Sequence, residues 1–151
     1  MIAAQGRELI AAAEKSGVPL LFEAAVGGGI PIIRPLAETL AGEPIGRVMG
    51  IVNGTTNYIL TQMTELNRPY AEALAEAQEL GFAEPDPTAD VSGADAASKA
   101  AILGSLAFGV WVPPAGVYVE GIEQIGVEDI AFAADLGFVI KLLGVSERRP
   151  E

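Results

Sequence analysis

Polar and apolar residues form two kinds of pattern along the chain. Stretches rich in helix-forming residues and free of internal proline predict helices, and these lie at residues 2–15, 57–65, 70–80, 95–108 and 127–136. Short apolar runs bounded by glycine or loop residues predict strands, at residues 18–25, 47–53, 117–122 and 138–145. The alternation of strands and helices predicts an α+β fold, an α/β sandwich in which helices pack on a mixed β-sheet.

Glycine and proline predict where several of these elements begin and end. A glycine follows three of the predicted helices, as is common at helix C-termini, and these are Gly17, Gly81 and Gly109. Three glycines at residues 27–29 predict a tight turn into a further helix with Pro31 in its first turn, where proline is favoured. A threonine of the Gly-Thr-Thr segment at residues 54–56 is the predicted N-cap of the helix over 57–65.

The composition indicates one globular domain over residues 1–151, because 50% of the residues are hydrophobic and 19% are charged. Twenty acidic residues against nine basic ones give a net charge of -11, which repels nucleic-acid phosphates and anionic membrane surfaces. The longest apolar run, residues 100–112, is too short to cross a bilayer, and the N-terminus has no signal-peptide pattern. We therefore expect a cytoplasmic protein that binds neither nucleic acid nor membrane.

The sequence contains no cysteine and no histidine. This excludes disulfides, thiolate and His-ligated metal sites, cysteine nucleophiles and every catalytic triad that uses histidine as its base. Lysine, carboxylates and tyrosine remain as candidates for proton transfer.

A dense group of charged residues at positions 77–99 is the main candidate for a functional site. It contains four acids and a lysine at the head of a very apolar run: Glu84, Asp86, Asp90, Asp95 and Lys99. Asp95 and Lys99 are four residues apart in a predicted helix, so a solvated ion pair worth about 0.2–0.5 kcal/mol is one interpretation. The rest of this helix leaves almost no polar face, which favours a helix buried nearly all round and a lysine that needs a partner.

Asp95 also has a structural interpretation, because Ser92 and Asp95 fit the S-x-x-D capping-box pattern. Capping and a functional role are compatible. A calcium loop is not supported, since the order D-x-[DN]-x-[DN]-G is absent. The group is better interpreted as a pocket for a small polar molecule with an ammonium group, which the carboxylates would hold while Lys99 faces its reacting oxygen.

The pattern A-x3-G-F-A-x-x-D-P-x2-D-V-x-G-x-D-x3-K at residues 77–99 closely resembles the signature of homoserine dehydrogenases. Three flanking stretches agree with the same family: F-E-A-A-V-G-G-G-I-P-I-I at 22–33, G-I-V-N-G-T-T-N-Y-I-L at 50–60 and D-L-G-F-V-I-K-L-L at 135–143. The resemblance spans essentially the whole chain. It implies the fold of that family's catalytic domain.

The resemblance implies the reversible, NAD(P)-dependent interconversion of L-aspartate 4-semialdehyde and L-homoserine, a step toward threonine, methionine and isoleucine. By match of position, Lys99 would be the proton donor to the aldehyde oxygen, and three acids would bind the substrate: Glu84, Asp90 and Asp95. Asn53, Gly54 and Thr55 would lie beside the nicotinamide and the substrate. From the residues alone, that segment is either a polar-ligand site at a helix start or a simple cap. The family also implies a homodimer.

The glycine run invites a dinucleotide-binding interpretation, which fails because G-x-G-x-x-G from Gly27 would need a glycine where Ile32 stands. In the family, this segment resembles a loop whose backbone carbonyls hold a monovalent cation, often sodium. The ligands that this resemblance implies are Glu23, Val26, Gly28 and Ile30.

The chain departs from the family in what it lacks. Family members begin with a Rossmann half that carries a glycine fingerprint and a further active-site lysine, and neither motif occurs in this sequence. Residues 1–30 resemble the tail end of that nucleotide-binding half. We therefore expect a catalytic, substrate-binding domain with negligible dehydrogenase activity by itself. The alternative is a non-catalytic small-molecule-binding or dimerisation module.

Overall fold

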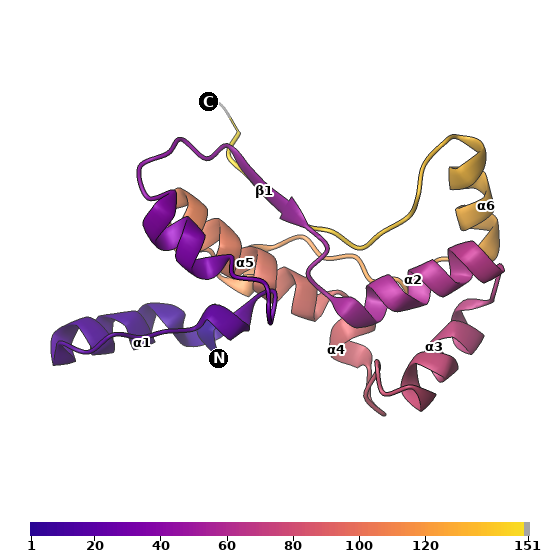
Figure 1. Cartoon of the computed structure of the whole chain (residues 1–151), viewed down its shortest axis with the longest axis horizontal. Coiled ribbons are helices and arrows are strands. Elements are labelled where there is room, and N and C mark those ends of the chain that lie inside the picture. Colours follow the sequence, from indigo (N-terminus) through magenta and orange to yellow (C-terminus); the bar gives the residue numbers. More distant parts are fainter. Residues whose placement is uncertain (150–151) are drawn as a thin grey trace. The chain divides into compact units, whose positions relative to one another are not determined.

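The computed structural model describes residues 1–149 as helices joined by irregular segments and one small sheet (Figure 1). The α-helices are α1 (Ile2–Ser16), α2 (Gly54–Leu66), α3 (Tyr70–Glu79), α4 (Thr88–Val91), α5 (Ala94–Phe108) and α6 (Val127–Asp135). Single turns of 3-10 helix are η1 (Glu23–Ala25) and η3 (Pro114–Gly116), and η2 (Pro35–Thr39) is a turn of π-helix. The strands are β1 (Arg47–Gly50) and β2 (Gly144–Glu147).

The chain forms two compact units, each assembled from separate stretches of sequence. Unit 1 contains Met1–Val52, Ala97–Tyr118 and the stretch from Gly144 onward. Unit 2 contains Asn53–Ala96 and Val119–Leu143. The unit boundary therefore divides helix α5 after its first turn.

Unit 1 joins α1, most of α5 and the two strands. β1 and β2 pair antiparallel, with Arg47 opposite Glu147 and Gly50 opposite Gly144. β2 lies on α5, because the Ser146 hydroxyl donates to the Ala100 carbonyl at 2.9 Å. The core of this unit is made by apolar residues from several of its segments: Ala3, Val26, Ile33, Leu36, Ile102 and Leu103.

Unit 2 is organised around α2, which packs against α3, α4 and α6 (Figure 1). Its core is centred on three residues of α2 that are fully buried, Ile59, Leu60 and Met63. α2 ends at Asn67 in the left-handed conformation, at φ 51°. Asparagine is one of the few non-glycine residues that adopts this conformation readily.

The helix predictions are largely confirmed. α1, α3, α5 and α6 begin and end within a residue or two of their predicted bounds, and Gly17, Gly81 and Gly109 all have positive φ at helix ends. Along α5 only Ala94 is exposed, so the helix is buried nearly all round, as its composition predicts.

Two helix starts differ from the prediction. α2 begins at Gly54, and its N-cap is Asn53 rather than a threonine, because the Asn53 side chain accepts the Thr56 N–H. Pro31 lies outside the following helical segment, in which Pro35 takes the first position of η2. The short helix α4 lies within the charged segment at 77–99, at residues to which no helix was assigned.

Three of the predicted strands are wrong in whole or in part, because their backbone groups bond elsewhere. In 18–25, the Val18 N–H bonds to the end of α1 and the Ala25 N–H closes the turn η1. In 117–122, the Ile122 N–H bonds to Val91, which ends α4. In 138–145, only Gly144 and Val145 are paired, and the strand continues to Glu147.

The predicted strand at 47–53 is shorter than expected, since β1 ends at Gly50. The α+β class is confirmed, and the sheet within residues 1–149 is a two-stranded antiparallel ribbon rather than a mixed sheet. In the part of the chain that the structure describes, no helix combines the length and the apolar character needed to cross a membrane.

Candidate active site

The centre of the polar site in unit 2 is the side-chain amide of Asn53, which is buried at 5% exposure. Its oxygen caps α2 by accepting the Thr56 N–H at 2.8 Å and the Thr56 hydroxyl at 2.9 Å. Its nitrogen donates to the Asp90 carboxylate at 2.6 Å and to the Asp95 carboxylate at 2.8 Å. One neutral amide therefore brings together two of the predicted substrate-binding acids.

The backbone between these acids is a tight turn from α4 to α5. Asp90 lies on α4, Asp95 lies in the first turn of α5, and Gly93 between them has φ 84°. A side chain at Gly93 would place its Cβ 2.7 Å from the Glu120 carbonyl oxygen. Glycine is required on both grounds, and the turn directs the two carboxylates to one amide. The Ser92–Asp95 capping box stays a prediction.

Asp86 and Thr55 form the hydrogen bonds that order residues 82–88, which precede and begin α4. The Asp86 carboxylate accepts the Thr88 hydroxyl at 2.6 Å and the Thr88 N–H at 3.2 Å, at the start of α4. These two hydrogen bonds hold the pKa of Asp86 below its ordinary value. The Thr55 hydroxyl donates to the Phe82 carbonyl at 2.7 Å. The Phe82 ring packs on Tyr58 of α2 at 4.7 Å between centroids, with the ring planes tilted by 36°. The loop at Phe82 is therefore held against α2 by a hydrogen bond and an aromatic contact.

Glu84 is the one predicted substrate-binding acid that does not join the Asn53 amide. It is exposed, and its backbone carbonyl accepts a hydrogen bond from the Gln78 side chain at 3.2 Å. The neighbouring Pro85 carbonyl accepts from the same amide at 3.3 Å. Gln78 therefore fixes the backbone at Glu84 and leaves its carboxylate at the surface.

Lys99 belongs to the part of α5 that lies in unit 1, and it is half-buried. Its Nζ donates to the carbonyl oxygen of Val52 at 2.9 Å. Val52 follows β1 and directly precedes Asn53 in the sequence. The predicted need of this lysine for a partner is met in part by this backbone oxygen, which orients Nζ.

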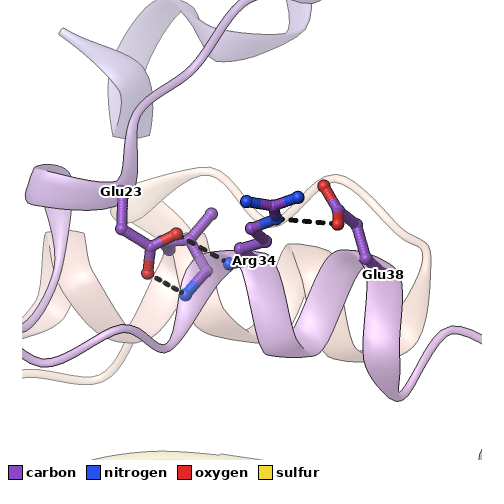
Figure 2. A network of polar contacts seen from close by, with 4 residues as sticks. Glu23, Arg34 and Glu38 are labelled. Atoms are coloured by element: carbon purple, nitrogen blue, oxygen red, sulfur yellow. Dashed lines mark hydrogen bonds and ion pairs between the residues drawn. The ribbon is translucent and has the colours of Figure 1, made fainter.

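The glycine loop of unit 1 is organised by the Glu23 carboxylate (Figure 2). It accepts three consecutive backbone N–H groups, from Ile32 at 2.7 Å, Ile33 at 2.9 Å and Arg34 at 2.9 Å. Desolvation by itself would raise the pKa of Glu23, but these three hydrogen bonds and the nearby Arg34 charge outweigh it and hold the pKa below the ordinary value. Arg34 also forms a surface ion pair with Glu38 at 2.8 Å.

The tight turn predicted at the glycine run is confirmed, since Gly27 has φ 81° and Gly28 has φ 57°. The four residues implied as sodium ligands surround this turn: Glu23, Val26, Gly28 and Ile30. Val26 is buried and Ile30 is exposed, with its N–H bonded to the Gly27 carbonyl at 3.0 Å. Within residues 1–149, no group of three or more acidic side chains could hold a metal ion. A cation here would depend on the backbone carbonyls, and the ligand set stays a prediction.

Sequence reasoning missed Lys141, a half-buried residue that lies in a segment predicted to be a strand. Its ammonium donates to the Asn57 side chain at 3.0 Å and to the Thr61 hydroxyl at 2.7 Å. Asn57 and Thr61 follow Asn53 at intervals of four residues along α2. This regular spacing of polar residues along α2 was the available signal.

These features define an α+β domain that carries a buried amide and carboxylate cluster at the start of a helix. The chain belongs to the homoserine dehydrogenase family, whose sequence profile matches residues 31–149. It is 53% identical over 148 residues to the homoserine dehydrogenase of Bacillus subtilis, a match that covers 98% of this chain and 34% of that protein. The chain therefore spans about a third of the length of this relative.

Solved structures give the same result. A crystal structure of a homoserine dehydrogenase from Thiobacillus denitrificans superposes with a TM-score of 0.95 at 47% identity, over 99% of this chain and 35% of that one. A hyperthermophilic archaeal homoserine dehydrogenase mutant in complex with NADPH superposes with a TM-score of 0.81 at 33% identity, over 97% of this chain and 42% of that one. The fold is thus that of the corresponding part of these enzymes.

Proposed function

We propose that this chain is the substrate-binding and catalytic portion of an oxidoreductase that interconverts L-aspartate 4-semialdehyde and L-homoserine with NAD(P). The observation that carries the proposal is the pair of carboxylates, Asp90 and Asp95, held by one buried amide within the family's signature segment. The full reaction belongs to a protein about three times as long, as the relatives are.

The carboxylate pair suits the amino group that both substrate and product carry. An ammonium group has three N–H donors, and each carboxylate retains acceptor capacity beyond the hydrogen bond that Asn53 supplies. Glu84, exposed on a loop whose backbone is fixed by Gln78, would add a third acidic contact. Binding at the ammonium end would orient the aldehyde at the other end of the molecule.

Lys99 would act as the proton donor. The nicotinamide cofactor, when bound, supplies a hydride to the aldehyde carbon, and the electron pair of the C=O bond moves onto oxygen. Lys99 gives that oxygen a proton from Nζ, which yields the alcohol and a neutral amine, and the reverse reaction returns the proton. The hydrogen bond from Nζ to Val52 orients the group, and its positive charge stabilises the developing alkoxide.

The segment of Asn53, Gly54 and Thr55 fits a contact with the cofactor through its backbone. Gly54 is exposed, and no atom lies within 4 Å of the position that a Cβ would take there. The side chains of Asn53 and Thr55 are already bonded within the protein. The NADPH complex of the archaeal relative supports a nicotinamide cofactor for this family member.

The same proposal includes further properties that the resemblance to the family implies. A monovalent cation, sodium, would be held by backbone oxygens of the glycine loop, with Glu23, Val26, Gly28 and Ile30 as ligands. The protein would act as a homodimer in the cytoplasm. Its product would supply threonine, methionine and isoleucine synthesis.

The proposal is tested with a chimera in which this chain replaces the matching 148-residue region of the Bacillus subtilis relative. We expect the chimera to oxidise L-homoserine, and Lys99→Ala to lower kcat by about 100-fold or more with a small change in KM. Lys15→Ala, an exposed lysine of α1, is the matched control. A folded chimera without activity would favour the non-catalytic module, and an active Lys99→Ala enzyme would remove Lys99 from the chemistry.

A further inference from the structure

The Asn53 amide has no hydrogen-bonding capacity left for a ligand. Both N–H groups of its nitrogen are used, one for each carboxylate, and its oxygen accepts two hydrogen bonds from Thr56. An amide has two donors and two acceptor positions, so all four are satisfied. The side chain is also buried. Its role must therefore be exerted through Asp90 and Asp95 and through α2.

Asn53 is also well placed to hold the carboxylates still. Hydrogen bonds to a carboxylate are shorter and stronger than those between neutral groups. The two hydrogen bonds from the Asn53 nitrogen are short, at 2.6 and 2.8 Å. Because the amide is neutral, it orients each carboxylate without cancelling its charge.

The backbone beneath the carboxylates is fixed independently of Asn53. The Ile122 N–H bonds to the Val91 carbonyl at 2.8 Å. A Cβ at Gly121 would lie 2.5 Å from that same carbonyl oxygen and 2.9 Å from the Cα of Ser92. Two glycines, Gly93 and Gly121, thus allow residues 119–122 to lie directly against the turn between α4 and α5. Above this backbone, the Asn53 amide contacts both carboxylates and helps to set the orientation of the two side chains.

We propose that Asn53 is a positioning residue that aligns Asp90 and Asp95 as a paired receptor for the ammonium group of an amino-acid substrate, and that its side chain does not contact the cofactor. This inference rests on the proposed function for the identity of the ligand. It assigns to Asn53 a task distinct from the backbone of Gly54, which stays open to a bound molecule.

The decisive variant is Asn53→Asp. Aspartate caps a helix about as well as asparagine, so α2 keeps its N-cap. The two donors toward Asp90 and Asp95 are replaced by an acceptor oxygen, and the carboxylates are repelled. The matched control is Thr64→Val, which removes a hydrogen bond from a threonine hydroxyl to the Leu60 carbonyl on the same helix, outside the Asn53 cluster.

The measurement is a titration of each chain with L-homoserine, followed by NMR chemical shifts, which also detect millimolar binding. We expect Asn53→Asp to raise the dissociation constant of L-homoserine by about tenfold or more. The reason is that losing two hydrogen bonds to charged groups costs more free energy than a tenfold change in the dissociation constant represents. Thr64→Val should stay within about twofold of the unchanged chain. Equal binding by the unchanged chain and Asn53→Asp, with α2 still helical, would overturn the proposal.

A second measurement needs no ligand. The side-chain N–H groups of Asn53 should exchange with deuterium at least about tenfold more slowly than those of Asn67, which is exposed at the end of α2. Equal exchange rates would overturn the positioning role. If Asn53 is protected but the unchanged chain binds no L-homoserine, the proposed substrate is wrong while the aligned carboxylate pair stands. The two failures are therefore distinguishable.

Discussion

Glu23 in unit 1 and Asn53 in unit 2 are both polar hubs, but they treat negative charge in opposite ways. The Glu23 carboxylate is the acceptor, and three backbone N–H groups surround it. Asn53 is the donor, and it holds two carboxylates that belong to other elements. At Glu23 the protein itself stabilises the charge, so the carboxylate serves the local fold. At Asn53 a neutral group donates to two carboxylates, and our proposal assigns that pair to ligand binding.

The difference teaches that the number of acids in a segment says little about which of them can bind something. The hydrogen-bond partners of each acid determine whether it can also contact a ligand. Three backbone N–H groups occupy the oxygens of Glu23 and lower its pKa against the effect of desolvation. The Asn53 amide instead donates a single hydrogen bond to each of Asp90 and Asp95. The following four changes test this contrast, beginning with the one expected to have the largest effect.

Gly121→Ala should disturb the Asn53 hub through its backbone. The added Cβ would meet the Val91 carbonyl oxygen at 2.5 Å, so the turn between α4 and α5 must move. We expect a loss of about 2–3 kcal/mol in the free energy of unfolding, measured by urea denaturation with circular dichroism. Gly42→Ala is the control, because nothing lies within 4 Å of its added Cβ. Equal stability of the two variants would show that the turn is not tightly packed.

Lys141→Met should loosen α2 one turn beyond the hub. The change removes the donor to Asn57 and Thr61 while keeping an unbranched side chain of similar length. Because the site is only half-buried, water can replace part of the loss, and we expect about 1 kcal/mol of destabilisation. Lys141→Arg keeps the donors and should recover most of it. If arginine were as destabilising as methionine, packing rather than hydrogen bonding would explain the effect.

Glu23→Gln should destabilise the glycine loop in a pH-dependent way. Glutamine keeps one acceptor and turns a donor toward the other N–H groups. The folded pKa of Glu23 is lowered, so its stabilising contribution is fully present above the unfolded value of about 4.3 and is lost as the pH falls through the folded pKa. The stability difference between the unchanged chain and Glu23→Gln should therefore be largest near neutral pH and shrink in acid. A constant difference across that range would refute the account.

Glu38→Gln should have the smallest effect. Its ion pair with Arg34 is drawn in Figure 2. The pair is short, at 2.8 Å, but the side chains of Arg34 and Glu38 are 75% and 61% exposed. Exposed ion pairs contribute little because solvent and salt screen them. We expect no measurable change in the urea midpoint at moderate salt. A shift as large as that of Glu23→Gln would mean that the loop depends on the surface pair rather than on the backbone donors.

The helices could be predicted from sequence because their determinants are local. The composition of α1, α3, α5 and α6 and the glycines at the helix ends were sufficient. The strands could not be predicted in the same way, because a short apolar run forms a strand only if its backbone hydrogen-bonds to a neighbouring strand. Residues 18–25 have the same apolar character as a strand, yet Leu21 is 86% exposed and the backbone bonds to helical turns.

The candidate site divides in the same way. The signature segment pointed to Asp90, Asp95 and Lys99, and the family follows from it. The contact between the Asn53 amide and two of these acids could not be predicted from residue spacing, because Asn53 precedes them by 37 and 42 residues. Likewise, the hydrogen bonds of Glu23 cross the glycine turn over 9 to 11 residues and match no capping motif. Interactions of this kind appear only when the tertiary fold is known.

The pairing of β1 with β2 has a consequence for the order in which the protein folds. Arg47 and Glu147 are partners across 100 residues of chain. During synthesis this ribbon cannot close until Glu147 has left the ribosome, whereas α2 and α3 are consecutive and can pack much earlier. Unit 2 therefore has a local nucleus available while unit 1 must wait for its last strand. Until β2 emerges, β1 presents an unpaired edge, which makes the nascent chain more prone to aggregation during that interval.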